Sequence, residues 1–202
     1  MIPAPGKVTV RLLAALVIVL TTASAAAAAE FVVKPGAPNR VVFTSKAATE
    51  TFTGTTDRME GRIVFDPAAP GDSIEVRITV DVASLDTGIG KRNQHMRENH
   101  LETKAYPTAM FEGAALRAPV DAVFAPGATV PVEVEGTFTL HGVSRPLHVT
   151  VKVTLRDDAT LAFETEFSVV LADYNISRPK FLFLKLSETQ VVSVSGLAAV
   201  RR

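Results

Sequence analysis

Apolar and polar residues alternate along most of the chain after residue 30. The clearest run is residues 74–82 (IEVRITVDV), where every second residue is apolar and the residues between are charged or polar. Successive side chains of a β-strand point to opposite faces, so this period of two predicts a strand with one apolar and one wet face. Residues 132–140, 147–155 and 163–171 carry the same alternation.

Shorter runs with the same pattern predict further strands. These cover residues 40–45, 49–54, 61–65, 109–116 and 189–197. Turn residues separate the runs at 34–39, 66–72, 125–127 and 156–158. The total is eight or nine strands with one apolar face each, which indicates antiparallel pairing in a single domain. Such strands either form a sandwich or close into a barrel, and periodicity does not choose between the two.

Residues 89–102 (IGKRNQHMRENHLE) break the alternation. Long, unbranched side chains tolerate a helix well, and the segment is rich in them. Ile89, Met96 and Leu101 are its only apolar residues, so we expect a mostly wet helix over the mouth or side of the β-structure. Tyr106 precedes Pro107 and is therefore biased toward the extended conformation of a following strand.

The first 29 residues predict a secretory signal peptide. Lys7 and Arg11 precede a short apolar run, which is followed by small residues ending in an alanine tract. The apolar run is shorter than the ~20 residues of a spanning helix. We expect cleavage after Ala29 and a single mature domain of residues 30–202, periplasmic or secreted.

The net charge and the absence of cysteine argue against several classes of protein. Without the signal the chain has 19 basic and 21 acidic residues, a net charge of −2, which gives no reason to expect a nucleic-acid partner. It has no cysteine, and hence no disulfide, no thiolate metal site and no lipidation cysteine. The fold must therefore be held by its core alone.

An ordered set of motifs resembles the YceI-like family. It consists of residues 42–46 (VFTSK), 61–66 (GRIVFD), 82–88 (VASLDTG), 91–97 (KRNQHMR), 106–111 (YPTAMF), 136–146 (GTFTLHGVSRP) and 173–179 (DYNISRP). The set covers almost all of the mature chain. One departure is Asn93, where the family usually has Asp.

The resemblance implies a fold, a ligand and a location. The fold is an all-β, extended lipocalin-like antiparallel barrel of about eight strands with one helix packed against it. The ligand is an apolar lipid, namely a polyisoprenoid, an isoprenoid quinone or a fatty-acid-like molecule, and the location is the bacterial periplasm or outside. Some family members pair as homodimers; no exposed apolar stripe in this sequence decides that point.

Apolar residues on the inward faces are candidates for the ligand site. They are Phe43, Phe65, Met96, Phe111, Phe138, Leu140, Phe163, Phe167, Ile176 and Phe181. Each is also explained by an ordinary core, and the sequence leaves the two alternatives even. Residues 181–184 (FLFL) are unusually apolar for a connection, so we expect Ile176, Phe181 and Phe183 to cover one end of the barrel.

Polar candidates are few. Arg92 and His95 are expected at the helix-covered mouth, where they would meet a ligand headgroup. His95 and His100 lack the i, i+4 spacing of paired metal ligands, and surface or turn positions are expected for His100, His141 and His148. Glu98 and Glu102 are interpreted as solvated partners of nearby basic residues.

Sequence signatures of catalysis are missing. The chain contains no G-x-S-x-G, no H-E-x-x-H and no glycine-rich phosphate loop. We therefore expect a binding or carrier protein without cofactor, metal or catalytic residues. The alternative is an envelope interaction or stress module with a filled barrel and a protein partner. A donor or acceptor in the envelope is left open.

Overall fold

The structure is a computed structural model that describes residues 28–47, 50–66, 74–119, 121–156, 160–181 and 184–201. The predicted signal peptide lies outside these residues except for its last two, and its cleavage stays a prediction. No helix within the described ranges has the length and apolar character needed to cross a membrane.

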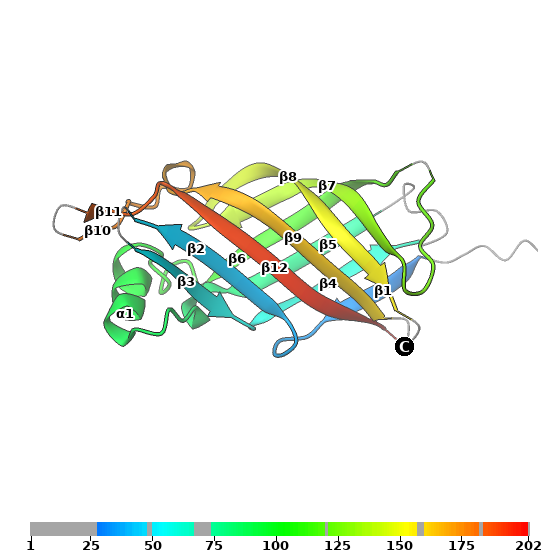
Figure 1. The fold of residues 1–202 in the computed structure, drawn as a ribbon, viewed down its shortest axis with the longest axis horizontal. Coiled ribbons are helices and arrows are strands. Elements are labelled where there is room, and N and C mark those ends of the chain that lie inside the picture. The colour runs from blue at the N-terminus through cyan, green and yellow to red at the C-terminus, as the bar shows by residue number, and fades with distance from the viewer. Residues whose placement is uncertain are drawn as a thin grey trace, which may run out of the picture.

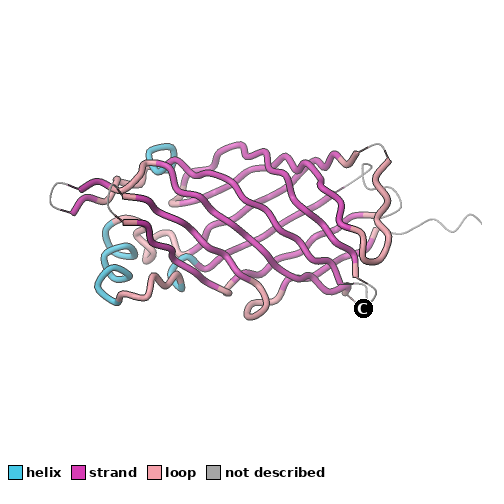
Figure 2. The backbone as a smooth tube through the Cα atoms, viewed as in Figure 1, coloured by secondary structure: helices cyan, strands magenta, loops and turns pink. Residues whose placement is uncertain are grey.

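Strands dominate these residues (Figures 1 and 2). They are β1 (Ala29–Val33), β2 (Arg40–Lys46), β3 (Thr51–Thr56), β4 (Met59–Phe65), β5 (Ile74–Asp81), β6 (Thr108–Arg117), β7 (Thr129–Leu140), β8 (Val143–Leu155), β9 (Thr160–Val170), β10 (Lys180–Phe181), β11 (Leu184–Lys185) and β12 (Thr189–Val200). The helices are α1 (Gly90–Asn99) and the 3₁₀ helices η1 (Val82–Ser84) and η2 (Leu171–Tyr174).

The main sheet closes into an antiparallel barrel. Its order is β1-β4-β5-β6-β7-β8-β9-β12, and β1 pairs with β12 to complete the ring. The first half of β12 pairs instead with β2, which carries β3 as an outer neighbour. The predicted all-β, lipocalin-like barrel with one helix is therefore confirmed. Because the β1–β12 pairing closes the sheet, the fold is a barrel and not a sandwich.

Several predicted strands are extended or shifted by a few residues, for example β7, which begins at Thr129 rather than 132, and β8, which begins at Val143 rather than 147. Two elements differ more. β1 was not predicted, because only four residues separate the expected cleavage site from the first turn. The helix is shorter than residues 89–102: it ends at Asn99, and the amide of Leu101 donates to the carbonyl of Met96 in a wider turn. Glu102 then adopts a positive φ of 44°.

The two ends of the barrel are built differently. At the end near the C-terminus, aromatic side chains fill the interior: Phe31 stacks on Phe65 at 5.6 Å between ring centroids, and Phe124 meets Phe65 at 5.7 Å. Helix α1 lies at the opposite end, beside β2 and β3 (Figure 1). A bridge between Thr55 and Asp86 connects β3 to the segment after η1. Aromatic packing thus stabilises the barrel at the end near the C-terminus, and the candidate site lies at the α1 end.

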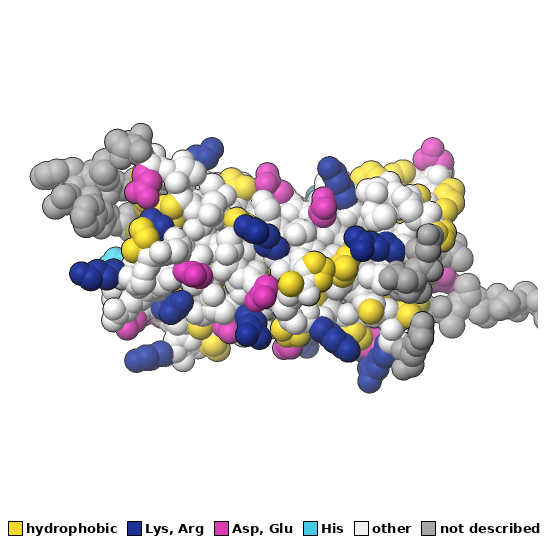
Figure 3. Space-filling model, turned by 60° about the horizontal axis from the view of Figure 1, so that its bottom comes forward, with side chains coloured by type: hydrophobic (Ala, Val, Ile, Leu, Met, Phe, Trp, Pro, Cys, Tyr) yellow, Lys and Arg dark blue, Asp and Glu magenta, His cyan; other side chains and the backbone are white. Residues whose placement is uncertain are grey.

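The outer face is wet and of mixed charge. Basic and acidic side chains are interspersed over the face shown in Figure 3. Several face one another across strands, among them Arg77 with Glu112 and Arg117 with Glu135. Exposed pairs of this kind contribute little stability, so the apolar interior accounts for most of it.

Candidate functional site

A large cavity occupies the α1 half of the barrel. Its volume is about 720 Å³. Inward-facing residues of several strands line it, and α1, η2 and the segment before β12 contribute the rest. The apolar lining includes Val41, Phe43, Phe52, Val80, Leu85, Met96, Leu101, Phe138, Leu140, Phe167, Val169, Leu171, Ile176, Leu186, Val192 and Val194. The polar lining residues are Ser45, Glu50, Lys91, Arg92, His95, His100 and Gln190.

Strand periodicity explains this lining. In β2, Val41, Phe43 and Ser45 face inward, and the residues between them face out. Gly54 of β3 is paired with Phe43, and a Cβ at Gly54 would lie only 2.1 Å from a Phe43 ring carbon. The phenyl ring therefore lies directly over the glycine, a close approach that any side chain at this position would prevent.

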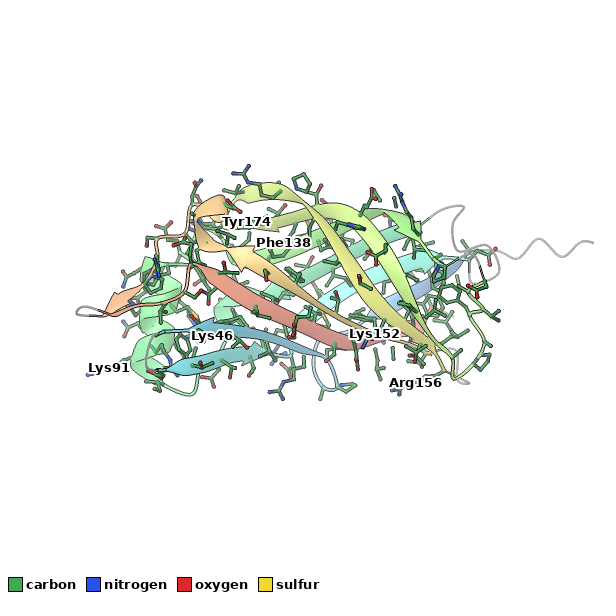
Figure 4. All side chains as sticks on the ribbon, turned by 45° about the horizontal axis from the view of Figure 1, so that its top comes forward. Lys46, Lys91, Phe138, Lys152, Arg156 and Tyr174 are labelled. Carbon is green, nitrogen blue, oxygen red and sulfur yellow. The ribbon has the colours of Figure 1, made fainter. Side chains whose placement is uncertain are left out.

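A smaller cavity lies further into the barrel. Its volume is about 130 Å³, and Phe65, Phe111, Phe124 and Phe163 contribute to its wall. Phe138 and Phe167 line both cavities, with their ring centroids 5.5 Å apart. Figure 4 labels Phe138 close to Tyr174 of η2, and those rings are 5.6 Å apart. The Phe138–Phe167 pair thus lies at the boundary between the two spaces, together with Val80, Ala109 and Val194, which also line both cavities.

The predicted ligand residues divide between the two cavities. Phe43, Met96, Leu140 and Ile176 line the larger one, together with the predicted mouth residues Arg92 and His95. Phe65, Phe111 and Phe163 line the smaller one. The side chain of Phe181 and all of Phe183 lie outside the described part of the chain, so their expected covering role stays a prediction.

Helix α1 is attached to the barrel through Asn93. This side chain is buried, with 8% of its surface exposed. Its Oδ1 accepts from the backbone N–H and the hydroxyl of Thr87 at 2.8 and 2.7 Å, and its Nδ2 donates to Asp86 at 2.7 Å. The amide thus donates one hydrogen bond to the turn that precedes the helix and accepts two from it, and it holds α1 over the cavity.

The Asn93→Ala variant should lose about 2–3 kcal/mol of unfolding free energy, because three hydrogen bonds vanish at a buried position.

The hydrogen bond from Asn93 is also the main reason that the pKa of Asp86 is lowered, followed by the bond from the backbone amide of Gly88. A lowered carboxyl pKa stabilises the fold above the unfolded pKa, and this stability is lost as pH falls. The acid-side loss should therefore be smaller in Asn93→Ala. Urea unfolding at pH 7 and pH 3 checks both effects. Gln94→Ala, on the exposed face, is the control and should change stability by less than about 0.5 kcal/mol.

Each nitrogen of the Arg92 guanidinium donates a hydrogen bond within the protein. Nε and Nη2 donate to the hydroxyl and carbonyl of Thr87, and Nη1 donates to Glu50 at 3.2 Å. The guanidinium carbon lies 4.1 Å from the centroid of the Phe52 ring. These contacts fasten the start of α1 to β3, so Arg92 closes the wall of the site through contacts within the chain.

His100 follows α1 and faces the cavity from the end of the helix. Its Nδ1 lies 2.9 Å from the carbonyl oxygen of Ser177. A carbonyl only accepts, so Nδ1 carries the proton. Burial lowers the pKa of His100, the Ser177 contact partly opposes this, and the neighbouring His95 lowers it further. The two imidazole rings lie 4.8 Å apart. His100 is thus a neutral imidazole whose Nε2 is an acceptor.

The lowered His100 pKa predicts a pH dependence of stability. The unfolded chain binds a proton near pH 6.5 and the folded chain only at lower pH, so unfolding becomes easier as pH falls below 6.5. The slope should be weaker in His100→Phe than in the unmodified protein. Urea unfolding between pH 8 and pH 5 measures this slope, and equal slopes in the two proteins would contradict this assignment.

His141 joins three segments at the same end. It lies in the two-residue turn between β7 and β8, where His141 and Gly142 both have positive φ, as a type I′ hairpin requires. Nδ1 contacts the carbonyl of Tyr174 at 3.0 Å, and Nε2 contacts Glu102 at 2.8 Å. Its side chain is only 8% exposed. The expected turn position is correct, but the side chain is buried and ties η2 to the segment after α1.

Sequence reasoning missed five polar residues of the cavity wall, namely Ser45, Glu50, Lys91, His100 and Gln190. A signal existed for Ser45, a polar residue in phase with Val41 and Phe43. His100 gave none, because its partner Ser177 is 77 residues away. Among the described residues, no group of three or more His, Asp and Glu side chains has the arrangement of a metal site.

The fold and the cavity define a class: closed antiparallel β-barrels that enclose an apolar internal cavity at a helix-covered end. The YceI-like domain model matches residues 31–196, and the chain belongs to this family. The resemblance seen in the sequence motifs is thereby confirmed.

Known proteins resemble the chain at low identity. Protein YceI of Escherichia coli O17:K52:H18 is 28% identical over 129 residues, which cover 61% of this chain and 62% of that protein. Two solved structures share the fold. BcnA of Burkholderia cenocepacia is 22% identical with a TM-score of 0.67, covering 80% of this chain and 96% of BcnA. A polyisoprenoid binding domain from Saccharophagus degradans, described as implicated in plant cell wall breakdown, is 20% identical with a TM-score of 0.68, covering 86% of this chain and 99% of the domain.

Proposed function

We propose that the protein binds and carries an isoprenoid, isoprenoid quinone or fatty-acid-like lipid in the bacterial periplasm or outside the cell, without covalent chemistry. The observation that carries this proposal is the cavity of about 720 Å³ inside a closed barrel. A volume of this size falls in the range of sites for small organic ligands. The solved relative from Saccharophagus degradans, which is named for polyisoprenoid binding, supports the same class of ligand.

The energetics suit a long apolar tail. Burial of each methylene contributes ~0.8 kcal/mol, so a tail of a few isoprene units offsets the loss of freedom on association. An apolar wall discriminates poorly between tails that differ by one methyl group. Selectivity must therefore come from cavity length and from the polar residues of the wall.

The alternative of an envelope module with a filled barrel has less support. A barrel with a filled interior needs side chains in the space that the larger cavity occupies. In this chain aromatic side chains fill the interior toward the opposite end. Pairing into a homodimer and an envelope donor or acceptor are compatible with lipid carriage, and neither is needed for it.

Extraction of the protein as made by a bacterium tests the proposal. The full chain is produced in a bacterial host, purified without detergent, extracted with organic solvent and analysed by mass spectrometry. We expect one lipid species, or a narrow family of them, near one molecule per chain. Recovery of no lipid, together with no thermal stabilisation by added isoprenoids or fatty acids, would overturn the proposal.

A further inference from the structure

The apolar cavity contains two buried polar atoms without a hydrogen-bond partner. They are Oγ of Ser45 and Nε2 of His100. Ser45 is only 1% exposed, and both residues line the larger cavity. A buried polar atom without a partner costs about 1–3 kcal/mol, and most such atoms in proteins are paired. Two of them on the wall of one cavity point to a bound molecule that supplies the partners.

The hydrogen-bonding capacity of the two atoms differs. Nδ1 of His100 donates to Ser177, so Nε2 offers a lone pair and requires a donor from the ligand. The Ser45 hydroxyl either donates or accepts. A ligand that satisfies both therefore carries an O–H group.

The position of the two residues orients the ligand. Ser45 follows Val41 and Phe43 along β2, so it lies at the α1 end of that inward row, and His100 follows α1 itself. Phe138 and Phe167 lie at the boundary with the smaller cavity. The polar atoms are thus near the helix-covered end, and the apolar tail of a ligand would run toward the packed end.

The charges nearby do not suit a strongly anionic headgroup. Arg92 has each of its nitrogens engaged, one of them by Glu50. A neutral imidazole lone pair also repels an anionic oxygen. Among the described lining residues, a diphosphate headgroup would therefore find one free cation, Lys91, and the lone pair of His100 Nε2, and not the cluster of free cations that would bind it tightly.

We propose that the cavity selects an isoprenoid-like lipid with a neutral hydroxyl at its polar end, an alcohol or a quinol, which donates its proton to Nε2 of His100 in a hydrogen bond and accepts a hydrogen bond from Oγ of Ser45. This inference rests on the proposed function and adds the chemistry of the polar end. Ser45 and His100 are specificity residues in it, and neither takes part in covalent chemistry.

A competition experiment with the full chain tests this selectivity. The protein is offered equal amounts of geranylgeraniol, its methyl ether, the parent hydrocarbon and geranylgeranyl diphosphate, and the bound species are quantified by extraction and mass spectrometry. The alcohol should exceed the ether about tenfold, since only the alcohol donates to His100. The ether should exceed the hydrocarbon, because it accepts from Ser45, and the diphosphate should bind more weakly than the alcohol.

Two variants separate the contributions. His100→Phe keeps the ring and should abolish the preference for the alcohol over the ether. Ser45→Ala should abolish the preference for the ether over the hydrocarbon, while stability stays equal or rises because a buried unpaired hydroxyl is removed. His148→Phe on β8 and Ser193→Ala on β12, both at outward-facing positions, are the matched controls and should leave all ratios unchanged.

The outcomes distinguish this inference from the proposed function. Equal binding of alcohol, ether and hydrocarbon would leave lipid binding intact and overturn the hydroxyl selectivity. A preference for the diphosphate would also overturn the hydroxyl selectivity. So would ratios of bound alcohol, ether and hydrocarbon that stay the same in both variants. Binding of no probe at all would overturn the selectivity and the proposed function together.

Discussion

The Val192→Trp variant should be purified without lipid while it still folds. Val192 faces the larger cavity from β12, opposite Phe43 of β2 and Phe167 of β9. An indole at this position extends into the space that a lipid tail would occupy. Displacing two methylene groups of the tail alone costs about 1.6 kcal/mol, more than tenfold in affinity. The measurement is the amount of lipid extracted per chain, with circular dichroism to verify the fold.

Val191→Trp provides the matched control. Val191 is the preceding residue of the same strand and faces outward, where it pairs with Thr44 and Ser168. It adds the same indole to the same strand without entering the cavity, so lipid recovery should equal that of the unmodified protein. If Val192→Trp retained its lipid in full, the cavity would not be the binding site.

The Phe138→Ala variant should shift the bound lipids toward longer tails. Phe138 and Phe167 lie at the boundary between cavities of about 720 and 130 Å³, and removal of one ring joins the two spaces. Truncation of a phenylalanine in an interior costs about 3 kcal/mol, so the melting temperature should also fall. The measurement is the distribution of tail lengths in the extracted lipid, compared with the unmodified protein.

Leu140→Ala is the control for this second experiment. Leu140 lies on the same strand and lines only the larger cavity. Its truncation widens that cavity without opening the boundary, so the tail-length distribution should stay as it is. An unchanged distribution in Phe138→Ala would show that the Phe138–Phe167 pair does not limit the length of the ligand.

The alternation of apolar and polar residues was enough to predict the strands and their inward faces. Ile74, Val76, Ile78 and Val80 are an example: they are the residues of β5 that line the interior. The period of two results from the local geometry of an extended chain. It can therefore be recognised without knowing which strands lie next to one another. The helix was recognised for the opposite reason, since a wet segment without alternation does not fit a strand.

The location of the cavity could not be predicted in this way. Phe43 and Phe65 look alike in the sequence, yet Phe43 borders the larger cavity, whereas Phe65 stacks on Phe31 and borders only the smaller one. Whether an inward phenyl fills the interior or borders a space depends on which side chains from other strands meet it. These contacts depend on the register of the whole barrel and on Phe124, whose ring packs against Phe65 at one end.

The sequence by itself determined an all-β chain with a wet helix, and its motifs indicated the family. Only the tertiary structure decided that the barrel is hollow at the α1 end, that Asn93 and Arg92 hold the helix there, and that Oγ of Ser45 and Nε2 of His100 are left without hydrogen-bond partners. The physical reason is the range of the interactions. Strand periodicity is set between adjacent residues, whereas the pairing of His100 with Ser177 and of Arg92 with Glu50 spans 77 and 42 residues and exists only once the barrel has closed.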